Sequence, residues 1–438
     1  MKLFSLLTAV LLSSASVSST PLDVRQVVSS SIVGSPSAIS TACSCPAAAT
    51  STASSASSAA ASATPSTPVV ANGTIINSYN STLSYNSTES FEDPSVYGVS
   101  AAGFADVHKA KVPLNIVLTN DDSWASANIR ALYYALRRAG HRVLMVAPAA
   151  NQSGQGGTVV LPTELNLTSA GRGGFVPVGS PYAGLNVTDP GLRYLDATPA
   201  ACSGWALDHD AQYFFNATRK NDSTAGVDLV LSGPNEGTNL GIAFYTGSGT
   251  LGASYFAVGR NVPSIAFSAS TNVRQYTALN LSDPADESVK LATYSSNFVT
   301  ALSDNAKSSN SSARIMPLGI GLTVNYPKIA PTGSCTNLTW THTRMTGKGL
   351  AVRLVVNATT GLPTYAFFGS DGINVCNAGN CSLPGETEVI SNGKCQASAS
   401  IYSVDYDAPT FRTQNTIAAL TSSIQSLNGN SNSSNSTA

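Results

Sequence analysis

The sequence predicts an α/β fold in which a mostly parallel β-sheet is covered by helices on both faces. Short apolar runs that are typical of buried strands alternate along the chain with longer segments of helical periodicity. Two complete strand–helix–strand units can be recognised, over 114–148 and over 227–270. The crossover in such a unit is right-handed in nearly all proteins and returns the chain to a parallel strand.

The first unit starts with LNIVLTN at 114–120, an apolar, β-branched run that is typical of a buried parallel strand. A helix is predicted over 126–140, because apolar side chains recur there on one face and Gly140 closes its last turn. The apolar face consists of Ile129, Leu132, Tyr133 and Leu136. The run HRVLMVAP at 141–148 is the second strand, and we expect His141 at its start to be exposed or at an edge.

The second unit repeats the pattern. A strand is predicted over 227–233, a helix over 248–261 and a strand over 262–270. A further helix follows at 287–305 and a further strand at 319–327. In open sheets of this kind, ligands bind beyond the carboxyl ends of the strands.

The N-terminus has the three parts of a secretory signal peptide. Lys2 is followed by the apolar run Leu3–Leu12 and then by small residues up to Thr20. That run is shorter than the ~20 apolar residues that span a membrane. We therefore predict a signal peptide over 1–19 and a protein that is secreted, either extracellular or in the cell wall. An ordinary buried N-terminal helix is the alternative.

Composition divides the rest of the chain. Residues 20–90 are rich in Ser, Ala and Thr, and we expect a disordered stalk there because so little apolar surface can be buried. The folded domain is predicted over 112–427, and the polar tail 428–438 resembles the stalk. Within the domain, 331–410 is predicted to be an extension rich in β-hairpins.

Cysteines and glycosylation motifs agree with secretion. We expect two disulfides among the four late cysteines, with the pairing left open, and a buried free thiol at Cys202; the pairing of Cys43 and Cys45 is also left open. The four late cysteines are Cys335, Cys376, Cys381 and Cys395. The Asn-x-Ser/Thr acceptors include Asn72, Asn80, Asn86, Asn166, Asn186, Asn216, Asn280, Asn337 and Asn357. They suggest a glycoprotein by their density rather than singly.

The charge balance limits the partners. The formal net charge of −1 gives no reason to expect a broad basic face for a nucleic acid duplex or an acidic membrane. A site for phosphate would have to draw its positive potential from a metal ion or from backbone N–H groups.

Two carboxylates stand side by side where the first strand ends, at Asp121 and Asp122. Adjacent carboxylates in a partly buried site raise each other's pKa unless a cation shares them. A hard divalent ion with oxygen ligands is the usual solution. The alternative is that one aspartate caps the next helix while the other faces solvent.

Polar residues also follow the other predicted strands. The loop AANQSGQGG after 141–148 contains Ser153, and PNEGTNLG after 227–233 contains Asn235 and Asn239. The segment YTGSGTLGAS begins a helix, where backbone N–H groups and the helix dipole favour an anion such as phosphate. A flexible loop and a plain helix cap are the alternatives for these pieces taken singly.

The order of these segments and the residues in them resemble the SurE (survival protein E) family of metal-dependent phosphatases and nucleotidases. The matching segments are NDDS, VAPAANQSG, ATPAACSGWAL, SGPNEGTNLG, YTGSGTLGAS, VPSIAFS and LTVNYP. The likeness covers roughly 112–330 well and reaches weakly to about 425. It implies a three-layer, Rossmann-like SurE fold with the C-terminal extension added.

The resemblance also implies a site and a cofactor. The implied metal ligands are Asp121, Asp122, Ser153 and Asn235. The implied phosphate-binding residues are Asn120, Asn239, Ser248, Gly249 and Thr250. Carboxylate, hydroxyl and amide oxygens suit Mg²⁺ or Mn²⁺. One aspartate, with Asp121 the first choice, would act as base or nucleophile.

The sequence departs from the family pattern at several positions. Ser123 replaces the usual glycine, so the turn after the aspartates is expected to differ, and Ala201 replaces a residue that is often acidic or polar. The loop before Ser153 lacks its usual basic residues, and one extra residue precedes Ser248. Asn151 is itself a glycan acceptor, and a glycan there would crowd the site.

The sequence thus predicts a secreted, metal-dependent phosphomonoester hydrolase of the acid phosphatase or nucleotidase type. Its substrate would be a small phosphorylated molecule such as a nucleoside monophosphate, and family analogy suggests a homodimer. The rival hypothesis is a non-catalytic wall or adhesion glycoprotein on the same scaffold. The Ser/Thr-rich stalk favours that rival, but it does not explain oxygen-bearing residues at three strand ends.

Overall fold

The computed structural model describes part of the chain. The described residues are 70–71, 74–78, 102–215, 226–308, 310, 312–329, 335, 337–373, 380–404 and 416–422. All of them belong to one compact unit, Ser66–Ala438. The predicted signal peptide, most of 20–90 and the tail 428–438 lie outside the described residues. So do Cys43, Cys45, Asn72, Asn80, Asn86, Asn216 and Cys376.

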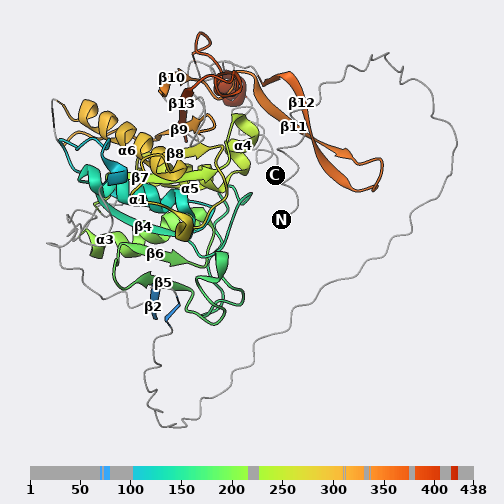
Figure 1. The fold of residues 1–438 in the computed structure, drawn as a ribbon. Helices are drawn as coiled ribbons and strands as arrows, with labels where there is room; N and C mark the ends of the chain where they lie inside the picture. The colour runs from blue at the N-terminus through green and yellow to red at the C-terminus, as the bar shows by residue number, and fades with distance from the viewer. Residues whose placement is uncertain are drawn as a thin grey trace, which may run out of the picture. The chain divides into compact units, whose positions relative to one another are not determined.

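One sheet of eleven strands lies at the centre of the domain (Figure 1). Its order is β1-β2-β5-β6-β4-β3-β7-β8-β9-β13-β10. The strands, in chain order, are β1 (Val70–Ala71), β2 (Thr74–Ser78), β3 (Asn115–Thr119), β4 (Arg142–Pro148), β5 (Ala183–Asn186), β6 (Leu192–Leu195), β7 (Leu229–Glu236), β8 (Ser264–Ala269), β9 (Ile320–Tyr326), β10 (Thr339–Thr343) and β13 (Gln396–Ser403). Every pair from β6 through β4, β3, β7 and β8 to β9 is parallel. The predicted, mostly parallel sheet is confirmed.

Helices cover both faces of the sheet, which gives three layers. Along β3, Ile116 and Leu118 pack into one apolar core, whereas Val117 packs into the other. Side chains alternate between the faces of a strand, so each face has its own core. Helices α1 (Ala127–Ala139) and α6 (Glu287–Ala306) contribute to the first core. Helices α2 (Pro199–Trp205) and α5 (Gly249–Gly259) contribute to the second.

The local signals in the sequence account for α1. Ser126 is its N-cap residue, and Gly140 follows it with φ 100°. The Gly140 N–H donates back to the carbonyl of Arg137, which satisfies one of the last free carbonyls of the helix. His141 is then buried, with 1% of its surface exposed, so the expectation of an exposed or edge histidine was wrong. Its Nδ1 accepts the N–H of Leu114, and this pairing requires the ring to lie inside.

The described residues include structure before the predicted boundary at 112. A short 3-10 helix at Ala102–Phe104 buries Phe104 in the first core. The sheet also gains β2, which pairs antiparallel with β5 although it lies within the stretch 20–90. The sequence signal for a strand at 74–78 is weak because the segment around it is polar.

The C-terminal extension contains strands beyond the parallel sheet, as expected. Strands β11 (Gly349–Val356) and β12 (Pro363–Ile373) form a separate antiparallel hairpin (Figure 1). Strand β10, which we expected in a hairpin, instead pairs parallel with β13, and β13 pairs antiparallel with β9. A short helix, α7 (Glu386–Ser391), precedes β13.

The cysteine predictions hold for the described residues. Cys335 and Cys395 form a disulfide across 60 positions of sequence, and Cys381 is also disulfide-bonded. Cys202 is a free, buried cysteine, as predicted. Among the described residues, the helices are all too short or too polar to cross a membrane.

Candidate active site

The acidic pair lies at the carboxyl edge of the parallel sheet, where β3 ends. Both side chains are buried: 2% of Asp121 and 3% of Asp122 is exposed. The segments after β4 and β7 and the start of α5 reach the same edge, because neighbouring parallel strands all end there. The alternative in which one aspartate faces solvent is therefore excluded.

The turn after the pair has the backbone conformation of a glycine although a serine occupies it. Ser123 has φ 104°, in the region that L-residues avoid. Asn120 holds the turn closed, since its Oδ1 accepts the Ser123 N–H and its Nδ2 donates to the Ser123 carbonyl. The Ser123 hydroxyl accepts the N–H of Ala125. These three hydrogen bonds offset the backbone strain, so the turn keeps the shape that a glycine would allow.

Asp121 is fixed against the start of α5 and against the loop after β4. The Thr250 hydroxyl donates to Asp121 Oδ1 at 2.5 Å, and the Gln152 N–H donates to the Asp121 carbonyl at 2.7 Å. A Cβ atom added at Gly249 would lie 2.9 Å from the Asp121 Cβ. Only glycine therefore lets the start of α5 come this close to the carboxylate.

Asp122 is fixed by residues that the sequence reasoning did not select. The Glu236 N–H donates to Asp122 Oδ2 at 2.9 Å, and Arg172 Nη1 donates to the Asp122 carbonyl at 2.8 Å. Arg172 Nη2 also pairs with Glu236 Oε1 at 2.9 Å. Glu236 brings a third carboxylate to the acidic pair.

Burial and mutual repulsion make these carboxylates costly to ionise. Burial raises the pKa of Asp122 well above its usual value, and the charges of Asp121 and Glu236 raise it further. The Glu236 N–H and the Arg172 guanidinium act in the opposite direction. Burial also raises the pKa of Asp121, against the lowering effect of the Thr250 hydroxyl. Arg172 forms its ion pair with Glu236 rather than with either aspartate, so this environment favours an additional cation.

Ser153 and Asn235 are each next in sequence to a residue that contacts the acidic pair. Gln152 donates to Asp121, and Ser153 follows it, with its N–H bound to Asn151 Oδ1. Asn235 precedes Glu236, and its Nδ2 donates to the carbonyl of Gly237. The Asn235 Oδ1 is therefore the end of that amide that is suited to act as a metal ligand.

The two other predicted asparagines have structural partners. Asn120 is fully buried in the Ser123 turn. Asn239 Nδ2 donates to Ser268 Oγ, and the backbone N–H of Asn239 donates to Asn325 Oδ1. Ser248 caps α5, because its hydroxyl accepts the Leu251 N–H. The structure thus ties Asp121, Gly249 and Thr250 together directly, while Asn120 and Asn239 support the loops around them.

The donor set fits a hard divalent cation. Among the described residues, no group of three or more His, Cys, Asp or Glu side chains is arranged to hold a metal ion. A site here would therefore combine the two carboxylates with hydroxyl and amide oxygens, a chemistry that suits Mg²⁺ or Mn²⁺. The burial of two adjacent carboxyl groups is the observation that favours it.

Local sequence carried a signal for one of the two missed residues. Glu236 lies inside the segment SGPNEGTNLG, of which only Asn235 and Asn239 were predicted to be site residues. Arg172 stands in GRGG, 50 positions after Asp122, and no short motif links the two.

Comparisons with known proteins identify relatives. The family model described as Survival protein SurE matches residues 116–348. An acid phosphatase of Yarrowia lipolytica is 44% identical over 314 residues, which are 70% of this chain and 85% of the relative. A 5'-nucleotidase SurE of Desulfovibrio desulfuricans is 33% identical over 155 residues, 35% of this chain and 49% of the relative. The crystal structure of the SurE protein from Aquifex aeolicus has a TM-score of 0.44 and 22% identity, and the match covers 70% of this chain and 99% of that one. The chain belongs to the SurE family.

Proposed function

We propose that this protein is a phosphomonoester hydrolase whose acidic pair works with one bound divalent cation. The reaction class rests on its relatives, an acid phosphatase and 5'-nucleotidases, which are both phosphomonoester hydrolases by name. The observation that carries the proposal is the pair of adjacent buried carboxylates beside the start of α5. The residues that would hold the cation are Asp121, Asp122, Ser153 and Asn235. When bound, a divalent cation supplies a Lewis acid for a phosphoryl oxygen.

The start of α5 would orient the phosphate. Its first backbone N–H groups, at Gly249 and Thr250, have the positive end of the helix dipole behind them. The Thr250 hydroxyl is already bound to Asp121, so it would fix the distance between the phosphate and the acidic pair. Gly249 has no side chain, which lets the start of α5 lie against Asp121.

The proton from the attacking water needs an acceptor at the same edge. Asp121 is our first choice for this base, because the Thr250 hydroxyl holds its carboxylate beside the start of α5. A nucleophilic role for the same carboxylate fits the same position. Substrates of the proposed enzyme are small phosphate monoesters, with nucleoside monophosphates as the first class to test.

Secretion and glycosylation belong to the proposal as well. The signal peptide over 1–19 and the glycan acceptors support them. Analysis of the culture medium by mass spectrometry, with and without glycosidase, tests both. A protein retained in the cell with Lys2 intact would contradict secretion.

The catalytic proposal is tested by Asp121→Asn and Asp122→Asn. Hydrolysis of p-nitrophenyl phosphate and of nucleoside monophosphates is measured with Mn²⁺, with Mg²⁺ and after chelation. Each variant should lose roughly 100-fold or more in kcat/KM, as for the removal of one strong transition-state interaction. The matched control is Asp208→Asn, because Asp208 pairs with Arg260 in a partly exposed ion pair in which 48% of the Asp208 side chain is exposed.

Two outcomes would contradict the proposal. Undiminished turnover in both variants would remove the acidic pair from the reaction. Turnover that persists unchanged after complete chelation would remove the cation. The rival hypothesis, a non-catalytic glycoprotein, predicts no turnover in the wild type and no effect of Mn²⁺ on its melting temperature.

A further inference from the structure

We propose that Arg172 and Glu236 form a positioning pair that holds Asp122 in the geometry required to bind the cation. The inference rests on the proposed function, because it concerns the same site. Neither residue is among the proposed ligands. Both side chains are largely shielded from solvent: 11% of the Arg172 side chain and 4% of the Glu236 side chain is exposed.

Glu236 holds the Asp122 carboxylate through its backbone. Its N–H donates to Asp122 Oδ2 at 2.9 Å, which fixes the rotation of that carboxylate. The Glu236 side chain is held in turn by the Ser126 hydroxyl and by Arg172 Nη2, each at 2.9 Å from Oε1. Ser126 lies at the start of α1, so Glu236 connects the end of β7 with the helix that follows the acidic pair.

Arg172 holds the backbone of the same aspartate. Its Nη1 donates to the Asp122 carbonyl at 2.8 Å while its Nη2 binds Glu236. A guanidinium presents several donors in a fixed plane, so one arginine can set two acceptors relative to each other. Asp122 is therefore held at two points, with Arg172 bound to its carbonyl and Glu236 bound to its carboxylate.

The turn that carries Arg172 is built for this placement. Gly173 and Gly174 follow it with φ values of 69° and 74°. The Arg172 N–H donates to the carbonyl of Ala149, just beyond the end of β4. A Cβ atom at Gly173 would lie 2.5 Å from the Gln275 side chain, so the turn packs directly on the segment after β8.

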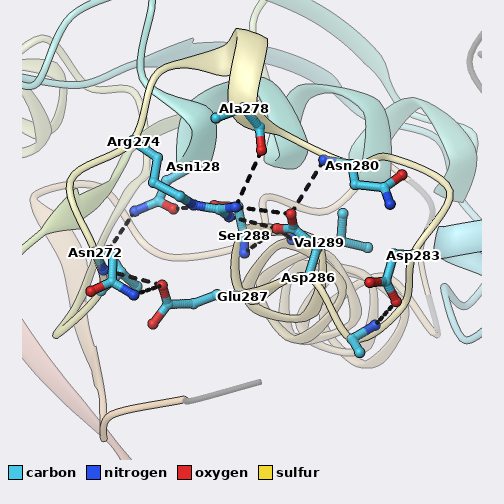
Figure 2. Close-up of polar contacts among 12 residues, drawn as sticks. Asn128, Asn272, Arg274, Ala278, Asn280, Asp283, Asp286, Glu287, Ser288 and Val289 are labelled. Carbon is cyan, nitrogen blue, oxygen red and sulfur yellow. Dashed lines mark hydrogen bonds and ion pairs between the residues drawn. The ribbon is translucent and has the colours of Figure 1, made fainter. Parts of the chain in front are cut away.

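That segment is itself fixed by a polar network (Figure 2). Arg274 pairs with Asp286 through both of its terminal nitrogens and donates to the Ser288 hydroxyl. The Ser288 hydroxyl donates to Asn128 Oδ1, which ties the start of α6 to α1. The carbonyl of Arg274 accepts from Arg172 Nη2 at 3.3 Å and from the Ala127 N–H at 3.0 Å. Arg172 is thus also held by the segment after β8.

A second buried ion pair provides the matched control. Arg137 and Asp189 lie 3.0 Å apart, and 5% of each side chain is exposed. Arg137 belongs to α1. The Tyr133 hydroxyl accepts from Arg137 and donates to Asp189, so this ion pair has its own hydrogen-bond partner, which is not a residue of the acidic pair. A loss that comes only from breaking a buried ion pair will appear at both sites, whereas a loss of cation binding will appear only at Arg172 and Glu236.

The experiment compares wild type, Arg172→Met, Arg172→Lys, Glu236→Gln and Arg137→Met. The readouts are the Mn²⁺ concentration that gives half of the thermal shift and the concentration that half-activates p-nitrophenyl phosphate hydrolysis. We expect both concentrations to rise roughly tenfold or more in Arg172→Met and Glu236→Gln. The Mn²⁺ concentrations for Arg172→Lys should fall between those of these two variants and those of wild type, because lysine keeps the charge but not the planar guanidinium. Arg137→Met should melt earlier with unchanged Mn²⁺ concentrations.

The outcomes separate this inference from the function on which it rests. If wild type responds to Mn²⁺ and the Arg172 and Glu236 variants need no more of it, the positioning pair is overturned while the function stands. If Arg137→Met changes the Mn²⁺ requirement as much as Arg172→Met does, the effect is general and the inference is overturned. If wild type neither hydrolyses phosphate monoesters nor responds to Mn²⁺, the proposed function fails and the pair fails with it. Should Arg172→Met not fold, Arg172→Lys and Glu236→Gln decide the question.

Discussion

Two regions of the molecule contain buried carboxyl groups, and the groups around them differ. At the end of β3, Asp121 and Asp122 lie side by side with Glu236 next to them. In the C-terminal extension, Glu386 is buried alone at the start of α7, with none of its surface exposed. Its Oε1 accepts the Gly241 N–H at 2.7 Å, and its Oε2 accepts the Ser400 hydroxyl at 2.9 Å.

The difference shows that clustered buried carboxylates need a compensation of charge that a single buried carboxyl group does not need. Burial raises the pKa of Glu386 to about 7, against the lowering effect of the two hydrogen bonds. One proton makes that group neutral, and the Ser400 hydroxyl can turn to accept it. In the acidic pair, each carboxylate raises the cost of ionising the next, and the Thr250 hydroxyl and the Glu236 N–H donate to the two carboxylates and so favour their ionised forms. We propose a bound cation for the first region, whereas one proton is enough to neutralise the second.

The largest effect is expected from Asp122→Asn, which should lower kcat/KM by roughly 100-fold or more and yet stabilise the metal-free protein. The change replaces a buried carboxyl group whose ionisation its neighbours oppose, and the amide oxygen can still accept the Glu236 N–H. The melting temperature after chelation should rise, with about 2–4 °C for each kcal/mol gained. Differential scanning calorimetry at pH 7.5 measures it, and Asp208→Asn serves again as the control. A lower melting temperature in the chelated variant would break the comparison.

Glu386→Gln should remove a pH dependence of stability. The folded protein holds this proton up to about pH 7, whereas the unfolded chain releases it near 4.5. The stabilising contribution is therefore complete below pH 4.5 and is lost as the pH rises through 7, by up to roughly 3 kcal/mol. Urea unfolding at pH 5 and pH 8 measures the change. The control is Glu388→Gln, a half-exposed neighbour; equal pH slopes in wild type and Glu386→Gln would contradict the prediction.

His141 should give an effect of similar size and opposite sign. Burial lowers its pKa from 6.5 to about 4, against the raising effect of Asp304. Its Nδ1 accepts the Leu114 N–H, so it cannot take a proton without losing that bond. The contribution is complete above pH 6.5 and is lost as the pH falls towards 4, by up to roughly 3 kcal/mol.

The variant His141→Asn keeps an acceptor for Leu114 and does not titrate. Unfolding free energies at pH 7 and pH 4.5 should differ less in this variant than in wild type. His108→Asn, at an exposed position, is the matched control. A wild-type pH slope that survives His141→Asn would assign the slope to other groups.

The smallest effect is expected from Lys348→Ala. Lys348 and Glu388 form an ion pair at 3.2 Å, with 52% and 49% of their side chains exposed. Water and salt screen such a pair, so the loss should be about 0.5 kcal/mol or less. This variant sharpens the comparison because it tests charge without burial in the same extension. A loss of several kcal/mol in urea unfolding would show that burial is not the deciding factor.

Sequence reasoning recovered the elements whose signals are local. The strand at 114–120 and the helix at 126–140 were found because periodicity and a closing glycine are contained within a few residues. The position of the acidic pair followed from the end of that strand. Arg172 could not be predicted, because its relation to Asp122 depends on a turn that folds back across 50 positions. The parallel pairing of β10 with β13 was missed for the same reason, since register across a long connection leaves no mark in either strand.

The place of β13 in the sheet has a consequence for shortened forms of the protein. This strand covers the outer side of β9, from Ile320 to Asn325, and β10 lies beyond it. A chain cut after Tyr326 would leave β9 as the sheet edge, with a row of unpaired backbone N–H and carbonyl groups. Such an edge is a template for strands of other molecules, and the buried, apolar residues of β9 would favour self-association. We therefore expect a chain shortened in this way to aggregate more readily than the whole chain.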